Sequence, residues 1–131
     1  MLTPAALLAD ARAAAERSYS PYSGFAVGAA VLTDAGEVIL GCNVENAAYG
    51  ESICAERNAV TTMVARGGRR VEAVAVVGLR AAPCWPCGAC RQVLREFGCR
   101  EVIVEDAEGQ PVTLDFSRLL PNSFGPDTLD P

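Results

Sequence analysis

Hydrophobic positions in the first third of the chain follow two different periods. From Pro4 to Ala15 the apolar side chains recur at helical spacing, and Thr3 just before them can cap a helix whose first position is a proline. The runs "AVGAAVLT" and "VILGCNV", at 26–33 and 38–44, are short and apolar and flank the turn-forming "DAGE". We therefore expect a helix followed by an antiparallel hairpin.

The rest of the chain alternates between helix-like and strand-like patterns. The segments "CAERNAVTTMVARGG" (54–68) and "CGACRQVLREFG" (87–98) have helical character and end at glycine. Continuous apolar runs follow them, "VEAVAVVGL" at 71–79 and "REVIVED" at 100–106. A tight turn then leads to "PVTLDF" (111–116), which we expect to be the last strand.

This order of elements favours an α/β fold built as one domain over residues 1–131, with 119–131 as an irregular C-terminal tail. We expect three layers, α/β/α, around a five-stranded mixed sheet that is mainly parallel and carries the antiparallel hairpin at its N-terminal end. Two helices, which begin at Cys54 and Cys87, each follow a strand, so the alternation places their starts at the carboxyl ends of strands. Open α/β sheets bind ligands at the carboxyl ends of their strands, so both helix starts are candidate site positions.

Charge and composition restrict the classes of partner. The chain has 16 acidic and 11 basic residues, and a net charge of −5 opposes binding to nucleic acid. No apolar run is long enough to cross a bilayer, and the N-terminal segment resembles an amphipathic helix rather than a signal peptide. We expect a cytoplasmic protein with no membrane partner, in which six cysteines bind metal or do chemistry rather than form disulfides.

Three cysteines lie at the two helix starts. Cys54 opens one helix, while Cys87 and Cys90 face the same side of the first turn of the other. Helix N-termini favour ionised sulfur, and three thiolates can hold one zinc ion and leave a fourth position for water. Glu56, two residues after Cys54, can exchange a proton with that water, although an acidic residue at a helix start can also simply stabilise the first turn.

A further cysteine, Cys84, adds a second Cys-x-x-Cys pair with Cys87. Proline fits before or at a helix start, and Pro86 directly precedes Cys87, which favours Cys87 and Cys90 as the ligand pair. The alternative is a closed site in which Cys54, Cys84, Cys87 and Cys90 all bind zinc. Such a site has no room for water, and the chain would then be a non-enzymatic zinc module.

The pattern "CAE" followed by "PCGAC" resembles the zinc nucleoside and nucleobase deaminases, and a cysteine as first ligand resembles the small all-cysteine cytidine deaminases. The stretches "SYSPYSGFAVGAAVL", "GCNVENAAYGESICAERNAV" and "LLPNSFGP" are similar to the same family, so the resemblance covers nearly the whole chain. It implies zinc-dependent hydrolytic deamination of cytidine and deoxycytidine to uridine and deoxyuridine, with release of ammonia, as in pyrimidine salvage.

The resemblance also implies roles for the residues at the metal. Cys54, Cys87 and Cys90 hold one zinc ion per subunit. Glu56 takes the proton of the attacking water, protonates ring N3 and then helps to protonate the leaving amine. Arg57 offers hydrogen bonds to the sulfurs and withdraws negative charge from a site in which three thiolates outweigh the divalent ion.

The nucleoside itself is expected to contact residues from several segments, and the family resemblance implies a homotetramer with shared active sites. Phe25 lines the base, Ala55 contacts it through its backbone, and Asn43 and Glu45 hold the ribose hydroxyls, while Tyr49 and Phe124 complete a neighbouring subunit's pocket. The nearest alternative is a blasticidin S deaminase or another small-molecule aminohydrolase, because blasticidin S deaminases share the three-cysteine site. The segments "NAAYGESICAER" and "SFGPDTL" favour a cytidine deaminase.

Overall fold

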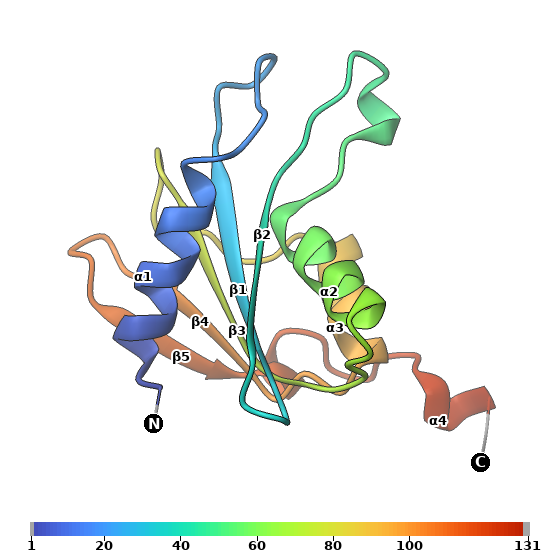
Figure 1. The fold of residues 1–131 in the computed structure, drawn as a ribbon. Helices are drawn as coiled ribbons and strands as arrows, with labels where there is room; N and C mark the ends of the chain where they lie inside the picture. The colour runs from blue at the N-terminus through green and yellow to red at the C-terminus, as the bar shows by residue number, and fades with distance from the viewer. Residues whose placement is uncertain (1, 130–131) are drawn as a thin grey trace.

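The computed structural model describes residues 2–129 and contains one five-stranded sheet with the strand order β2-β1-β3-β4-β5 (Figure 1). The strands are β1 (Val27–Thr33), β2 (Val38–Cys42), β3 (Val71–Gly78), β4 (Glu101–Glu105) and β5 (Pro111–Asp115). The helices are α1 (Pro4–Ala15), α2 (Ala55–Ala65), α3 (Gly88–Glu96) and α4 (Pro126–Leu129), with single 3-10 turns at Tyr49–Glu51 and Phe116–Arg118.

The α/β class, the mixed five-stranded sheet and the N-terminal hairpin are confirmed, but the expectation of a mainly parallel sheet is wrong. Among the described strands only β3 and β4 pair in parallel; β1 is antiparallel to both β2 and β3, and β5 is antiparallel to β4. The crossover through α2 makes β3 parallel to β2 in direction, but β1 lies between them. The connection from β4 to β5 is too short for a crossover and forms a hairpin instead.

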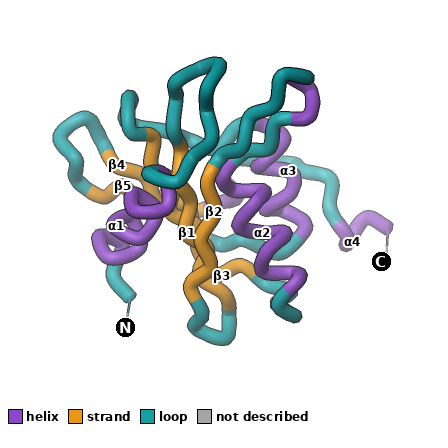
Figure 2. The backbone as a smooth tube through the Cα atoms, turned by 45° about the horizontal axis from the view of Figure 1, so that its top comes forward, coloured by secondary structure: helices purple, strands orange, loops and turns teal. Residues whose placement is uncertain are grey.

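The three expected layers are present. α1 packs on one face of the sheet against β1 and β3, and α2 packs on the other face, where α3 lies beside it (Figures 1 and 2). Each face has its own cluster of buried apolar side chains. Two glycines allow the close approach, because an added Cβ at Gly28 would meet the backbone of α1 and one at Gly41 would meet the backbone of α2.

Two loops project from the edge of the sheet at which α2 begins (Figure 1). We name them the first arm (residues 16–26) and the second arm (residues 43–54). Isolated β-bridges join Tyr19 to Val44 and Val44 to Ile53, so the second arm is paired with the first and with itself. The arms therefore stand together over the edge of the sheet where ligand binding is expected.

The C-terminal segment, expected to be irregular, contains a short helix within the described residues. α4 begins at Pro126, a favourable first helical residue, and has Asp127 in its first turn, where the helix dipole favours a negative charge. This part of the chain leaves the sheet and runs past α3 (Figure 1). Residues 130 and 131 of the expected tail lie outside the described part.

Two findings concern the state of the cysteines and the search for membrane-spanning helices. All six cysteines lie in the described part of the chain and are free thiols. No helix within residues 2–129 has the length and apolar character needed to cross a membrane.

Candidate metal centre

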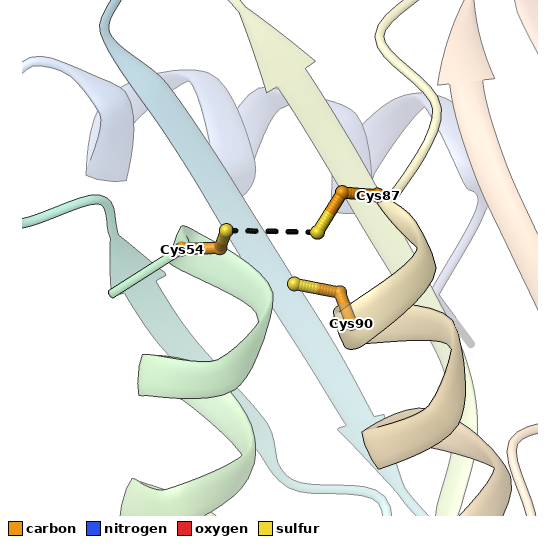
Figure 3. A group of neighbouring side chains, drawn as sticks. All are labelled: Cys54, Cys87 and Cys90. Atoms are coloured by element: carbon orange, nitrogen blue, oxygen red, sulfur yellow. Dashed lines mark hydrogen bonds between the residues drawn. The ribbon is translucent and has the colours of Figure 1, made fainter. Parts of the chain in front are cut away.

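Three sulfur atoms converge between the starts of α2 and α3 (Figure 3). Cys54 is the N-cap of α2 and Cys87 is the N-cap of α3, while Cys90 is buried in the first turn of α3. The three Sγ atoms all lie within 4.8 Å of one another, and those of Cys54 and Cys87 are 3.8 Å apart. The structure thus brings together the three cysteines that the sequence analysis selected, which we call the cysteine cluster.

The cysteine cluster fits a zinc ion. Tetrahedral zinc with Zn–S bonds of about 2.3 Å separates its sulfur ligands by about 3.8 Å, which matches the separation between Cys54 and Cys87. Neither of these side chains makes a capping hydrogen bond to the backbone of its own helix, and the N-terminal end of each helix favours negative charge on the sulfur beside it. Both the donor atoms and their spacing are those of a zinc site.

Hydrogen bonds to Cys54 favour its thiolate form. Despite the opposing effect of burial, the hydrogen bond with Cys90 holds the pKa of Cys54 well below its usual value, and Arg57 lowers it further. Nη2 of Arg57 donates to Sγ of Cys54 at 3.3 Å, and the same contact raises the pKa of Arg57. The structure therefore places a permanent positive charge against the cysteine cluster, as the resemblance implies.

Glu56 is the second residue of α2 and is only 4% exposed, beside the fully buried Ala55. Burial raises the pKa of Glu56 to about 7, and the negative charge on Cys54 acts in the same direction. A carboxyl group that titrates near neutral pH can both accept and return a proton under physiological conditions. Glu56 thus has the environment of a general acid and base.

Cys84 is close to the cysteine cluster but is not part of it, because the group of converging ligand atoms in residues 2–129 contains three cysteines. An ideal Cβ on Gly78 would lie 3.2 Å from Sγ of Cys84 and 3.1 Å from Cε1 of Phe25, so the thiol and the ring both lie against this glycine. Burial raises the pKa of Cys84 to about 11. The geometry does not form the closed four-thiolate site, and Trp85 packs against the core.

Asn43 fixes the position of Phe25. Its Nδ2 donates to the carbonyl oxygen of Phe25 at 2.8 Å, and its Oδ1 accepts from the backbone N–H of Val27 at 2.9 Å and from the hydroxyl of Ser18. Both lone pairs of the amide oxygen are therefore used, and one N–H of the amide remains. The contact of Ser18 was not predictable from the sequence, since a serine after a helix carries no signal that it will bond to residue 43.

Glu45 joins the two arms. One carboxylate oxygen accepts from the backbone N–H groups of Tyr22 (3.0 Å) and Ser23 (3.1 Å), and the other accepts from the hydroxyl of Ser23. The bond from the Ser23 side chain is the main reason that the pKa of Glu45 lies below its usual value. Glu45, Tyr22, Ser23, Tyr49 and Ser52 line an open cavity of about 300 Å³ between the arms.

The two aromatic residues assigned to a neighbouring pocket are largely exposed in the single chain. Tyr49 is 76% exposed and contacts Tyr22 edge to face, with the ring centroids 5.9 Å apart. Phe124 is 56% exposed and lies beside α3, where Nε2 of Gln92 donates to its carbonyl oxygen at 3.0 Å. Gln92, which holds Phe124, lies more than one helical turn after Cys87 at the start of α3.

Residues 2–106 match the family model described as "Cytidine and deoxycytidylate deaminase zinc-binding region". The chain belongs to the cytidine and deoxycytidylate deaminase family. This deaminase chain is 46% identical to a cytidine deaminase of Mycobacterium tuberculosis over 94% of its own length and 90% of the relative. It is 42% identical to a cytidine deaminase of Sporosarcina psychrophila, over 94% and 92% of the two chains.

Solved structures agree with this deaminase family membership. The crystal structure of a cytidine deaminase from Burkholderia pseudomallei superposes with a TM-score of 0.87 at 46% identity, over 94% of this chain and 100% of the other. The family resemblance drawn from the sequence is confirmed. The zinc-binding region of the family spans all three members of the cysteine cluster, so zinc is the cofactor of this deaminase.

Proposed function

We propose that this protein is a cytidine deaminase that hydrolyses cytidine and deoxycytidine to uridine and deoxyuridine and releases ammonia. The observation that carries the proposal is the three-sulfur cluster beside a buried carboxyl group, Glu56, whose pKa is about 7. The chain's similarity to cytidine deaminases over nearly its whole length supports the same reaction. We assign this reaction to pyrimidine salvage in the cytoplasm, and the free thiols at all six cysteines support a reducing compartment.

The cysteine cluster holds one zinc ion per subunit in this proposal. Bound zinc supplies the Lewis acidity that activates water for attack on an electron-poor ring carbon. A divalent ion with three thiolates carries one net negative charge, which weakens that acidity. The guanidinium of Arg57 donates to the sulfur of Cys54 and draws part of this charge away from the ion.

Glu56 moves the protons of the reaction. It accepts one proton from the attacking water and transfers it to ring N3 while the water oxygen bonds to C4. It then passes the remaining hydroxyl proton to the exocyclic amine, and the oxygen stays on C4 as a carbonyl. The C4–N4 bond breaks and the amine leaves as ammonia. Burial of Glu56 supports this role, because it holds the pKa near neutrality and separates the carboxyl group from bulk water.

The arms and the start of α2 bind the nucleoside. Phe25 lines the base and the backbone of Ala55 contacts it, while the remaining N–H of Asn43 donates to a ribose oxygen. The carboxylate of Glu45 has about four acceptor positions, and three of them accept hydrogen bonds from the first arm. The remaining position accepts a hydrogen bond from a ribose hydroxyl. The negative charge of Glu45 disfavours a 5′-phosphate nearby, so we expect nucleosides rather than nucleotides as substrates.

The chain acts as a homotetramer with shared active sites in this proposal, and its partner is a second copy of itself. The support is the exposure of the two aromatic rings that the family resemblance assigns to a neighbouring pocket, those of Tyr49 and Phe124. Large exposed aromatic side chains are typical of protein interfaces. Sedimentation of the purified protein tests the assembly, and a monomer with full activity would contradict it.

Ammonia release tests the reaction and separates the related deaminases. The purified protein is given cytidine, deoxycytidine, cytosine, dCMP and blasticidin S in separate assays. We expect turnover of the two nucleosides and little turnover of dCMP. Turnover of blasticidin S without turnover of cytidine would replace the proposal by a blasticidin S deaminase.

The Cys84→Ser variant separates the enzyme from the non-enzymatic zinc module. We expect it to keep one zinc ion per subunit and its deaminase activity, because Cys84 lies outside the cysteine cluster. Cys87→Ser is the matched control and should lose zinc. Loss of zinc from Cys84→Ser as well would support the four-thiolate module.

A further inference from the structure

One face of α3 binds the C-terminal segment, which we define as residues 119–127. Nη1 of Arg91 donates to the carbonyl oxygen of Leu119 at 2.9 Å, and its Nε donates to that of Pro86 at 2.8 Å. Gln92, the next residue, donates to the carbonyl oxygen of Phe124. The helix whose start carries two cysteines of the cluster therefore also holds the chain around Phe124.

Arg95 makes two further side-chain attachments to this segment. Its Nε donates to Oγ of Ser123 at 2.9 Å and its Nη2 donates to Oδ1 of Asp127 at 2.7 Å, so one guanidinium holds the residues on both sides of Phe124. The hydrogen bond from Arg95 lowers the pKa of Asp127, which keeps this carboxylate ionised. Charge-assisted hydrogen bonds of this kind are short and directional.

The chain between these two attachments is closely fitted to the guanidinium. A Cβ added at Gly125 would lie only 2.5 Å from Nη1 and 2.6 Å from Nη2 of Arg95, so the backbone of Gly125 rests on the guanidinium plane. The backbone of Phe124 is therefore fixed, by Gln92 at its own carbonyl and by Arg95 on both sides. Phe124 as a whole nevertheless remains 56% exposed.

We propose that Arg95 is a positioning residue that fixes Phe124 for the pocket of the neighbouring subunit. The inference rests on the role proposed above for Phe124. A ring on a free segment would lose conformational entropy each time it closed over a nucleoside, and a backbone fixed beforehand avoids that loss. Arg95 therefore affects nucleoside binding in another subunit without contacting the nucleoside.

Steady-state kinetics with cytidine tests this inference. We expect Arg95→Ala to raise KM about tenfold, the loss of roughly one well-placed aromatic contact, and to leave kcat within about twofold. Zinc content and tetramer size should stay unchanged. Arg100→Ala is the matched control, because Arg100 pairs with Glu72 at 3.7 Å and its side chain donates no hydrogen bond to the C-terminal segment; its KM should equal that of the wild type.

A double-mutant cycle shows whether Arg95 acts through Phe124. Phe124→Ala should raise KM by a similar factor, and the Arg95→Ala/Phe124→Ala double variant should be no worse than Phe124→Ala alone. Gly125→Ala gives an independent variant should Arg95→Ala fail to assemble. It displaces the guanidinium while keeping its charge, and we expect the same rise in KM.

Mixed tetramers test whether the effect crosses the subunit boundary. Glu56→Gln subunits keep Arg95 and Phe124 but lack the proton-transfer group, whereas Arg95→Ala subunits keep it. In a mixed tetramer, an active site in an Arg95→Ala subunit can receive Phe124 from a neighbouring Glu56→Gln subunit that has an intact Arg95. Such sites should show the low KM of the wild type. A KM that stays high in every mixed tetramer would overturn the inference.

The two proposals fail in different ways. If Phe124→Ala leaves KM unchanged, the role of Phe124 fails and the inference fails with it. If Phe124→Ala raises KM but Arg95→Ala and Gly125→Ala do not, only the role of Arg95 is overturned. Additive effects in the double variant would also overturn it, because Arg95 would then act by another route.

Discussion

Gly41 lies where β2 meets α2, and it provides a direct test of how the sheet positions the metal site. A Cβ added at this glycine would lie 2.5 Å from the backbone nitrogen of Ala59 and 3.0 Å from its Cα, and it would also meet the carbonyl oxygen of Ala55. All these atoms belong to the backbone of α2, which cannot turn aside as a side chain can. The Gly41→Ala variant must therefore push α2 away from the sheet.

The size of this displacement follows from the contact distances. The 2.5 Å contact with Ala59 is about 1 Å shorter than ordinary van der Waals contact, which begins near 3.4 Å, so α2 must move by about that amount. Zinc–sulfur bonds tolerate deviations of only about 0.2 Å. Because Cys54 is the N-cap of α2, the movement shifts its sulfur away from the position in which it can share one zinc ion with Cys87 and Cys90. Overpacking of this kind costs about 1–3 kcal/mol of folding free energy.

The assay measures zinc per subunit after dialysis against a weak chelator, together with urea unfolding. We expect Gly41→Ala to lose zinc and turnover. Gly28→Ala is the matched control, since its Cβ would meet the carbonyl oxygen of Ala11 and lie 2.9 Å from Cα of Ala15 in α1, on the opposite face of the sheet. Gly28→Ala should be destabilised yet retain zinc. Equal zinc retention in the two variants would refute the reasoning.

Three further predictions concern single side chains. Glu56→Gln should lower turnover at least about a hundredfold with zinc retained, since it keeps the shape of the side chain but cannot carry the proton; near-normal turnover in ammonia release would remove Glu56 from the mechanism. Arg57→Ala should weaken zinc retention or turnover, measured by chelator competition and kinetics, and unchanged values of both would defeat the proposed role of Arg57. The pKa of Glu45 is lower in the folded state than its ordinary value of 4.5, so its contribution to stability is complete above pH 4.5 and is lost as the pH falls through the folded-state pKa. The stability difference between wild type and Glu45→Gln, measured by urea unfolding, should therefore shrink below pH 4.5, and a constant difference would contradict this.

The types and approximate bounds of the main elements were predictable from the sequence because their causes are local. Thr3 caps α1 through a hydrogen bond to the backbone of Ala6, and the expected hairpin of β1 and β2 forms around its four-residue turn. The expectation of a mainly parallel sheet was wrong, although β3 and β4 do pair in parallel. Periodicity shows that 71–79 is a strand but not which strands it will lie beside, and in the structure it lies between β1, to which it is antiparallel, and β4, to which it is parallel.

The metal site was predictable for a related reason. Cys87 and Cys90 share one helical turn, and Cys54 begins another helix after a strand, so chain order alone brings all three to one edge of the sheet. The groups that support the site were not predictable in this way. Ser23 bonds to Glu45 across 22 residues of sequence and Arg95 bonds to Ser123 across 28, and such contacts depend on tertiary packing that no local pattern encodes.

Two kinds of interaction hold the two halves of the site, and each half should respond to a different perturbation. The zinc-binding residues and Glu56 lie on helix starts that are fixed by backbone packing against a buried sheet, as at Gly41. The two arms are joined by backbone bridges at Val44 and by hydrogen bonds that involve the side chains of Asn43 and Glu45, and several of their large side chains are exposed. Hydrogen bonds near solvent open at lower free-energy cost than core packing does. Mild denaturant should therefore raise KM before it lowers zinc content, because the arms loosen while the packed helices still hold the cysteine cluster.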